Sequence, residues 1–167
     1  DLYRRYAHRA HDLYYAVYER NPGFGTVAGK IYQKYCNEVM ATYLAIARYH
    51  SREEGLKELE GKTLYEPYMR SVAKNYLRAC GLNALLLTSG DNDTYPLLYV
   101  QEKQWFRRDV HVVNTELLKS PRYIEYVRDL QPYLPLFSLS YNDYGGYSNE
   151  FIFVKPRFDY QIGRAHV

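Results

Sequence analysis

Two short apolar runs restrict the fold of this 167-residue chain more than any other feature. Residues 84–88 (Ala-Leu-Leu-Leu-Thr) and 110–113 (Val-His-Val-Val) are typical of strands that are covered on both faces of a sheet. Between them we expect a polar loop at residues 91–94 and a helix from Pro96 to about Trp105. Because strand–helix–strand crossovers are almost always right-handed, the two strands should be parallel.

Helical patterns lie on both sides of this unit. Pro67 begins a helix that should end near Gly81, which occupies the position of a left-handed C-cap, and Pro121 begins a further helix. Residues 151–154 (Phe-Ile-Phe-Val) form a candidate strand after a Gly-Gly turn at 145–146. The apolar stripe of the first helix consists of Met69, Val72, Ala73, Tyr76, Leu77 and Cys80.

The N-terminal third has a purely helical pattern. Residues 2–20 and about 26–50 predict two helices joined by a tight turn, and Ser51 is a candidate cap for another helix, with Gly55 and Gly61 as breaks. The predicted fold class is therefore α/β: a small Rossmann-like parallel sheet with flanking helices, preceded by an α-helical hairpin or repeat-like segment.

The spacing of Ala10, Tyr14 and Pro22 resembles the second helix of a tetratricopeptide repeat, although Val17 stands where a small residue is expected. We divide the chain into a helical repeat-like segment at 1–62, an α/β domain at 63–160 and a tail at 161–167. The tail resembles a translated sequencing adapter, so we expect it to take no part in the fold. Since the chain starts at Asp1 inside a helical pattern, we expect the natural N-terminus to lie upstream.

The charge and the cysteine content argue against several classes of protein, namely nucleic-acid-binding, disulfide-rich and zinc-binding proteins. The net charge of +3 arises from interspersed Lys and Arg, which argues against nucleic acid as a partner. Cys36 and Cys80 lack the spacing of a disulfide framework or zinc site, and we expect both to be buried thiols. No run approaches the roughly 20 apolar residues of a membrane span. His8 and His11 share a helix face and are expected on a packing or solvated surface.

The carboxyl edge of the predicted sheet carries the candidate site. Ligands usually bind in α/β proteins beyond the carboxyl ends of the strands. Asp91 and Asp93 on a turning loop could share Mg²⁺ or Mn²⁺ and so support a sugar phosphate. The competing interpretation is that Asp93 or Thr94 caps the helix while Asp91 holds the turn. The ligand-binding candidates at this rim are Asp91, Asn92, Asp93, Thr94 and Asn114.

The residues before the second strand have two interpretations. Arg108 is a further ligand candidate because it could reach a phosphate. The favoured interpretation is that Arg107 and Arg108 form surface ion pairs with nearby carboxylates, because such pairs are common. Trp105 and Phe106 are expected to fill the core. The Asp-x-Asp pattern of sugar-nucleotide transferases is matched by Asp91 and Asp93.

Residues 75–114 resemble a soluble segment of a bacterial protein-O-mannosyltransferase-like membrane protein family of unknown function. The shared core is Gly-Asp-Asn-Asp-Thr-Tyr-Pro at residues 90–96. The resemblance also includes Tyr76, Leu77, Cys80, Asn83, Ala84, Tyr99, Gln101, Glu102, Arg108, Asp109, Val110, Val113, Asn114, Tyr123 and Ile124. It implies an α/β module on the extracytoplasmic side of the cell envelope, beside helical repeats. Mannosyl transfer would be expected of the membrane part, whose place is taken here by amphipathic helices.

Three hypotheses follow for function. The first is an extracytoplasmic accessory or ligand-binding module that recognises a glycan or a phosphate-containing ligand. The second is a glycosyltransferase-related enzyme that uses a metal-bound sugar donor. The third is a structural scaffold whose helical segment binds protein partners.

Overall fold

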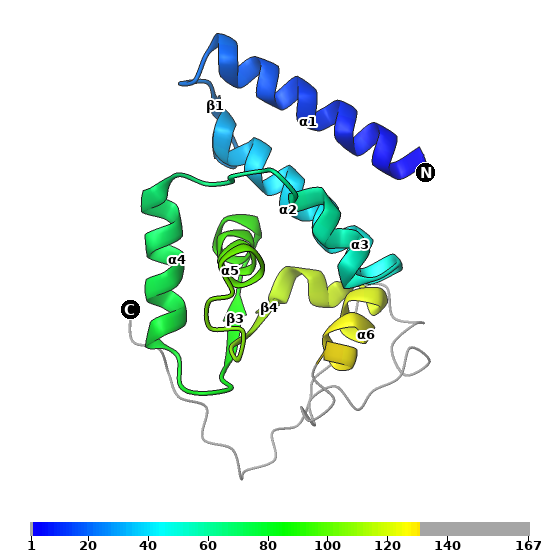
Figure 1. The fold of residues 1–167 in the computed structure, drawn as a ribbon, viewed down its shortest axis with the longest axis vertical. Coiled ribbons are helices and arrows are strands. Elements are labelled where there is room, and N and C mark those ends of the chain that lie inside the picture. The colour runs from blue at the N-terminus through cyan, green and yellow to red at the C-terminus, as the bar shows by residue number, and fades with distance from the viewer. Residues whose placement is uncertain (1, 131–167) are drawn as a thin grey trace.

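The computed structural model describes residues 2–130. Figure 1 shows a helical hairpin above a small α/β unit. The elements are α1 (Leu2–Arg20), β1 (Gly25–Thr26), β2 (Gly29–Lys30), α2 (Ile31–Tyr49), α3 (Arg52–Leu56), the 3-10 helix η1 (Lys57–Leu59), α4 (Pro67–Ala79), β3 (Leu85–Thr88), α5 (Asp91–Gln104), β4 (His111–Asn114), the 3-10 helix η2 (Thr115–Lys119) and α6 (Pro121–Leu130). No helix among residues 2–130 has both the length and the apolar character that crossing a membrane requires.

The two apolar runs form the parallel pair that the sequence predicts. Strand β3 pairs with β4 in parallel, from Leu85 opposite His111 to Thr88 opposite Asn114, and α5 makes the crossover. The described residues thus combine helices with a two-stranded parallel sheet, and the candidate strand at 151–154 lies outside them. The prediction that β3 is covered on both faces is wrong for the described residues, because Leu87 is 57% exposed.

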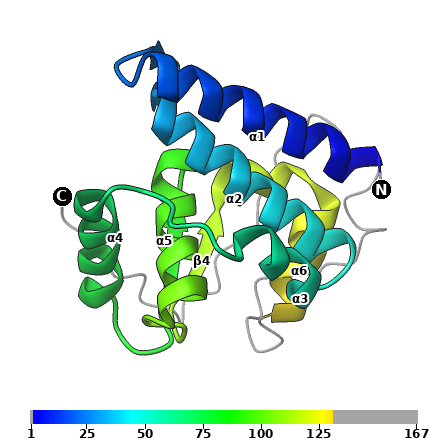
Figure 2. The same ribbon diagram turned by 45° about the horizontal axis from the view of Figure 1, so that its top comes forward.

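The N-terminal helical hairpin is confirmed. Helices α1 and α2 pack side by side, and α2 lies between α1 and the α/β unit (Figure 2). Helix α2 begins at Ile31, later than expected, because residues 25–30 form the small antiparallel ribbon β1–β2. Thr26 stabilises the ribbon turn by donating from Oγ1 to the Gly29 carbonyl over 2.8 Å.

Helix α2 supplies much of the hydrophobic core. One of its faces packs on α1, and it also contacts α3, α5 and α6. A polar link binds it to the α/β unit: the Tyr43 hydroxyl donates to Glu102 Oε1 over 2.8 Å, and Arg52 forms an ion pair with the same carboxylate. The buried side chains of α2 are Ile31, Cys36, Asn37, Val39, Met40, Thr42, Tyr43, Leu44, Ile46 and Ala47.

Local predictions about caps have mixed outcomes. Ser51 caps α3 as expected, since its side chain accepts from the Glu54 N–H. Gly55 lies inside α3 instead of ending a helix, whereas Gly61 has φ +66° and does form a break. The expectation that Gly81 provides the left-handed residue after α4 is wrong, because Asn83 has that conformation with φ 53°. Asn tolerates positive φ better than most residues.

Gly55 permits the close approach of α3 to α2. A Cβ atom at this position would lie 2.8 Å from the Tyr43 carbonyl oxygen and 3.2 Å from Ala47 Cβ. We expect Gly55→Ala to lower the free energy of unfolding by about 1–3 kcal/mol, because two packed helices would have to separate. Urea unfolding followed by circular dichroism would measure this. Gly81→Ala is the control, with nothing within 4 Å of its Cβ; equal losses in both variants would contradict the packing argument.

His11 makes the α1–α2 interface sensitive to acid. Its side chain is 6% exposed and its Nε2 lies 3.1 Å from Thr42 Oγ1. Burial lowers the pKa of His11 below its usual value. The unfolded chain therefore binds this proton at higher pH than the folded chain does, and stability falls as pH drops through the usual histidine range of about 6.5.

We expect His11→Gln to reduce the loss of stability between about pH 7 and pH 5, the range in which an unfolded histidine gains its proton. Urea midpoints at several pH values would show it as a smaller difference between neutral and acidic conditions than in the parent chain. An unchanged pH dependence would refute the assignment to His11.

Candidate functional site: a groove between α4 and β3

The polar stretch that follows β3 is the first turn of a helix and not a loop. Helix α5 begins at Asp91, and Pro96, expected at its start, lies buried inside it. The bend from strand to helix depends on Gly90, whose φ of 78° and ψ of 177° are accessible almost only to glycine. Pro96 therefore lies beyond the first turn, where it has no N–H to donate to the carbonyl of Asn92 and α5 lacks that backbone hydrogen bond. The interpretation of Asp93 or Thr94 as the helix cap is also wrong, since Gly90 is the N-cap and no side chain caps the helix.

Two of the predicted ligand residues are part of the internal structure. Thr94 is fully buried and donates from Oγ1 to the Gly90 carbonyl over 2.7 Å. Asn114 is buried, and its Oδ1 accepts from the Glu116 N–H over 2.9 Å while its own N–H donates to the Tyr123 hydroxyl. These side chains lie at the carboxyl edge of the strands as predicted. Their hydrogen bonds stabilise the starts of α5 and η2, and neither side chain lines the groove between α4 and β3.

Asn92 joins the α/β unit to the helical hairpin. Its Oδ1 accepts from Asn37 Nδ2 over 2.7 Å and from Gln33 Nε2 over 3.3 Å, and its Nδ2 donates to the Ala28 carbonyl over 3.1 Å. Asn37 is 1% exposed, and its Oδ1 accepts from the Tyr65 hydroxyl. Asn92 therefore has a structural role as well as a place on the groove wall.

The two carboxylates of the first turn of α5 differ in their surroundings. Both Asp91 and Asp93 are exposed. Burial, followed by the Asp91 carboxylate, raises the pKa of Tyr95. The pKa of Lys34 is raised mainly by its hydrogen bond to Glu38, with a smaller contribution from Asp91. Asp93 has no hydrogen-bond or ion-pair partner among residues 2–130 and lines the groove.

Residues two apart on a helix point to different sides, so the helical turn separates these carboxylates instead of converging them as a loop could. Among residues 2–130 no three His, Cys, Asp or Glu side chains are grouped to hold a metal ion. A cation on Asp91 and Asp93 stays a prediction.

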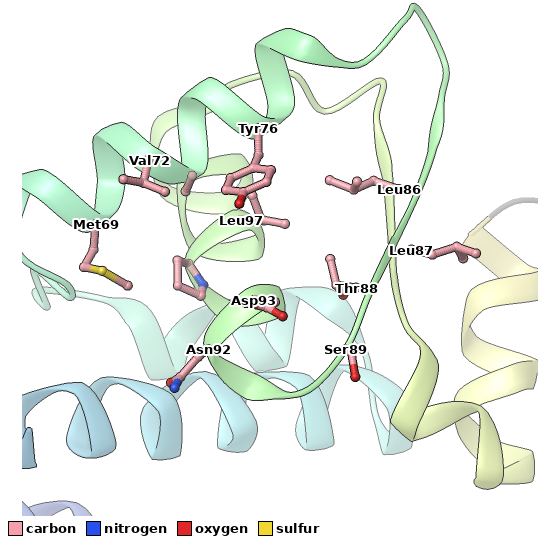
Figure 3. A pocket seen from close by; sticks show the side chains of 12 residues that line it. Met69, Val72, Tyr76, Leu86, Leu87, Thr88, Ser89, Asn92, Asp93 and Leu97 are labelled. Atoms are coloured by element: carbon pink, nitrogen blue, oxygen red, sulfur yellow. The ribbon is translucent and has the colours of Figure 1, made fainter. Parts of the chain in front are cut away.

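The groove itself has an apolar length and a polar end. It encloses about 370 Å³ between α4, β3 and the start of α5. Figure 3 shows Tyr76 extending from α4 over the groove, with its hydroxyl on the side of Asp93. The apolar lining consists of Met69, Val72, Ala73, Tyr76, Leu86, Leu87, Pro96 and Leu97, and the polar end of Thr88, Ser89, Asn92 and Asp93.

The structure places Arg108 away from this groove. It lies before β4, at the amino end of the strands, and its guanidinium lies 4.5 Å from the centre of the Trp105 ring. Trp105 is 73% exposed, so its expected role in the core is wrong; its left-handed backbone at the end of α5 coincides with this outward placement. Phe106 is half-buried against the core.

Arg107 is the structural arginine of the pair. It donates to both carboxylate oxygens of Asp109 over 2.8 Å and holds the pKa of that carboxyl well below its usual range. It also donates to the carbonyls of Leu77, Cys80 and Gly81 at the end of α4. The surface-pair interpretation is thus confirmed for Arg107.

The remaining histidine and the two cysteines of the sequence analysis lie outside the groove. His8 Nε2 lies 2.6 Å from Oε2 of Glu58, a buried carboxylate of η1 that is remote in sequence. Cys36 is buried as expected, and burial raises the pKa of its thiol to about 11. Cys80 is half-buried, so that prediction was too strong.

Sequence reasoning missed Tyr76 and Ser89 as groove residues. Tyr76 belongs to the predicted apolar stripe of α4, but it is 62% exposed and lines the groove. Ser89 follows the predicted strand directly, at the carboxyl edge of the sheet. Tyr76 and the buried Leu77 both fall within the apolar stripe that helical spacing predicts. The sequence pattern therefore does not show that Tyr76 is exposed while Leu77 is buried.

The parallel strands, the crossover helix α5 and the groove beside β3 define a small α/β module packed under a helical hairpin. The model of the family described as TMEM260-associated domain 2 matches residues 69–164, more than half of the chain. The chain therefore belongs to this family. Neither the curated proteins nor the solved structures contain a match.

Replacing Asn92 and Asp93 by alanine tests whether Asn92 supports the fold and Asp93 does not. We expect Asn92→Ala to lower the free energy of unfolding by about 1–3 kcal/mol, because buried Asn37 Nδ2 loses its acceptor. Asp93→Ala should cost less than about 1 kcal/mol, the size of its interaction with the helix dipole. Urea unfolding of the two variants measures the difference, and a larger loss for Asp93→Ala would contradict these assignments.

Proposed function

We propose that this chain is an extracytoplasmic accessory module that binds a glycan in the groove between α4 and β3. The observation that carries the proposal is the unpaired Asp93 carboxylate at the polar end of an apolar groove, beside Ser89 and below the exposed ring of Tyr76. Sites for small ligands commonly combine an apolar lining with a few polar groups that fix orientation.

A sugar ring suits this combination of groups. Its apolar C–H face can pack on the Tyr76 ring, and its hydroxyls can donate to the carboxylate of Asp93 and exchange hydrogen bonds with Ser89. Leu86 and Leu87 extend the apolar wall for a second sugar unit. The groove would thus contact both the apolar face of the sugar ring and the hydroxyls at its edge.

The charge at the start of α5 favours a neutral glycan over a free phosphate. A helix N-terminus attracts anions through its free N–H groups and dipole. Here Asp91 and Asp93 place two negative charges on the first turn, and both are exposed. A phosphate-containing ligand would need a cation between itself and these carboxylates.

The family background supports the class of ligand. The resemblance to the protein-O-mannosyltransferase-like family suggests a mannose-containing glycan and a position on the extracytoplasmic side of the cell envelope. We infer that the complete family domain is Rossmann-like, with its binding edge beyond the carboxyl end of β3, where such folds bind ligands.

Two other functions have their own supporting observations. A glycosyltransferase-related enzyme with an Mg²⁺- or Mn²⁺-bound donor is supported by the Asp-x-Asp pattern of Asp91 and Asp93. A scaffold for protein partners is supported by the exposed apolar side chains Leu2, Tyr6 and Leu13 along α1. The first predicts donor turnover, and the second predicts partner capture that does not depend on Asp93.

Calorimetric titration of the full chain with an α-linked mannose disaccharide tests the proposal. Asp93→Asn and Tyr76→Ala should each weaken binding at least tenfold, because the first removes the charged acceptor and the second the stacking surface. Trp105→Ala is the matched control: another exposed aromatic ring, at the opposite end of the strands.

Absence of saturable binding, or an equal loss in Trp105→Ala, would overturn the proposal. Adding Mg²⁺ or Mn²⁺ with a mannose donor distinguishes the enzyme hypothesis. Donor consumption that is lost in Asp91→Asn and Asp93→Asn would replace simple binding with catalysis.

A further inference from the structure

We propose that two loops at the amino end of the strands bind an anionic lipid surface, with Leu82 and Trp105 entering its headgroup region. The loops are residues 80–84, between α4 and β3, and residues 105–110, between α5 and β4, and together they are called the basic tip. Both lie at the lower end of the molecule in Figures 1 and 2, opposite to the polar end of the groove. This contact does not depend on glycan binding.

The two loops form one surface because side chains of the second loop bind the first. Arg107 donates to the carbonyls of Cys80 and Gly81 over 3.1 and 2.8 Å. The Asn83 N–H donates to Asp109 Oδ2 over 3.2 Å. Arg107 and Asp109 also form an ion pair. The loops are therefore held together, and the one carboxylate in the sequence of the basic tip is neutralised within it.

The basic tip exposes two large apolar side chains. Leu82 is 82% exposed and Trp105 is 73% exposed. Such side chains gain free energy when they leave water for the apolar boundary of a bilayer. A tryptophan suits this depth, because its ring is apolar and its N–H can donate to lipid oxygens. These two residues are therefore suited to shallow insertion into a lipid surface.

Basic side chains lie beside the apolar ones. The Arg108 guanidinium lies 4.5 Å from the centre of the Trp105 ring. Lys74 and Arg78 of α4 lie 5.5 and 5.2 Å from the centre of the Phe106 ring. Helix α4 and the first loop contain no Asp or Glu, so these positive charges have no carboxylate beside them in sequence. Lipid phosphates complement this charge.

Leu82 favours a lipid surface over a soluble polyanion such as a nucleic acid. The positive charges alone would suit either partner, because both present rows of phosphates. An exposed leucine gains nothing from a phosphate, whereas a bilayer also offers an apolar phase directly below its phosphates. The combination of Leu82, Trp105 and the three bases is therefore matched best by an anionic bilayer.

The opposite end of the sheet carries the opposite charge and sets an orientation. Asp91 and Asp93 are exposed at the carboxyl end of β3. An anionic surface attracts the basic tip and repels this acidic end. The polar end of the groove would then be directed away from the lipid.

Fluorescence of the full chain with vesicles tests the proposal, since Trp105 is the single tryptophan of the sequence. With vesicles of equal parts phosphatidylcholine and phosphatidylglycerol, Trp105 emission should shift to shorter wavelengths and be quenched by lipids brominated on their acyl chains. Vesicles of phosphatidylcholine alone should produce neither change. Added salt should weaken binding, because it screens the attraction between the bases and the phosphates.

Variants locate the contact by vesicle co-sedimentation. Arg78→Gln combined with Arg108→Gln should weaken binding by about tenfold or more, since each base near an anionic bilayer contributes about fivefold. Lys57→Gln combined with Lys119→Gln is the matched control, because it changes the net charge equally at two exposed lysines elsewhere.

Leu82→Ser should weaken binding about fivefold or more, because the inserted side chain is lost. Leu13→Ser, at another exposed leucine, should leave binding unchanged. Circular dichroism spectra like that of the parent chain show that each variant is folded.

The absence of binding to the mixed vesicles, equal binding to phosphatidylcholine alone, or binding without quenching of Trp105 would overturn the proposal. Equal losses in the variants and their matched controls would do the same. Tighter binding to a single-stranded oligonucleotide, unaffected by Leu82→Ser, would assign the basic tip to a soluble polyanion instead. Mannose binding can succeed or fail independently of each of these results.

Discussion

The buried amide of Asn37 is the interaction on which the arrangement of this molecule depends. It accepts from the Tyr65 hydroxyl and donates to Asn92, and it thereby joins α2, the segment before α4 and the start of α5. A buried amide without partners costs about 1–3 kcal/mol, so these three segments are favoured together. The Glu102 carboxylate makes a second connection through Tyr43 and Arg52.

This network also decides which polar groups can meet a ligand. Fixing Asn92 against α2 sets the rotation of the first turn of α5, and Gly90 allows that turn to follow β3 directly. Thr94 consequently points into the interior, and Asp93 is left on the groove wall without a partner among residues 2–130. Three of the five polar residues at the carboxyl edge therefore support the fold, namely Asn92, Thr94 and Asn114. The other two are exposed carboxylates, and of these Asp93 lines the groove.

Much of the local structure was predictable because it depends on short-range patterns. The apolar runs of β3 and β4, their parallel pairing, the helices beginning at Pro67 and Pro121, and the Ser51 cap all follow from neighbouring residues and the handedness of crossovers. The start of α5 was missed because proline usually marks a first helical turn, whereas here Gly90 and tertiary packing begin the helix five residues earlier.

The sequence by itself determined the class of the fold and the edge of the sheet where polar residues gather, since periodicity and chain direction set both. Only the tertiary structure decided that Asn92, Thr94 and Asn114 support the fold and that Tyr76 and Asp93 face a groove. The same holds for Trp105, an apolar residue that lies outside the core. Burial and hydrogen-bond partners depend on segments far apart in the chain, such as α2 and α5, whose contact no local pattern specifies.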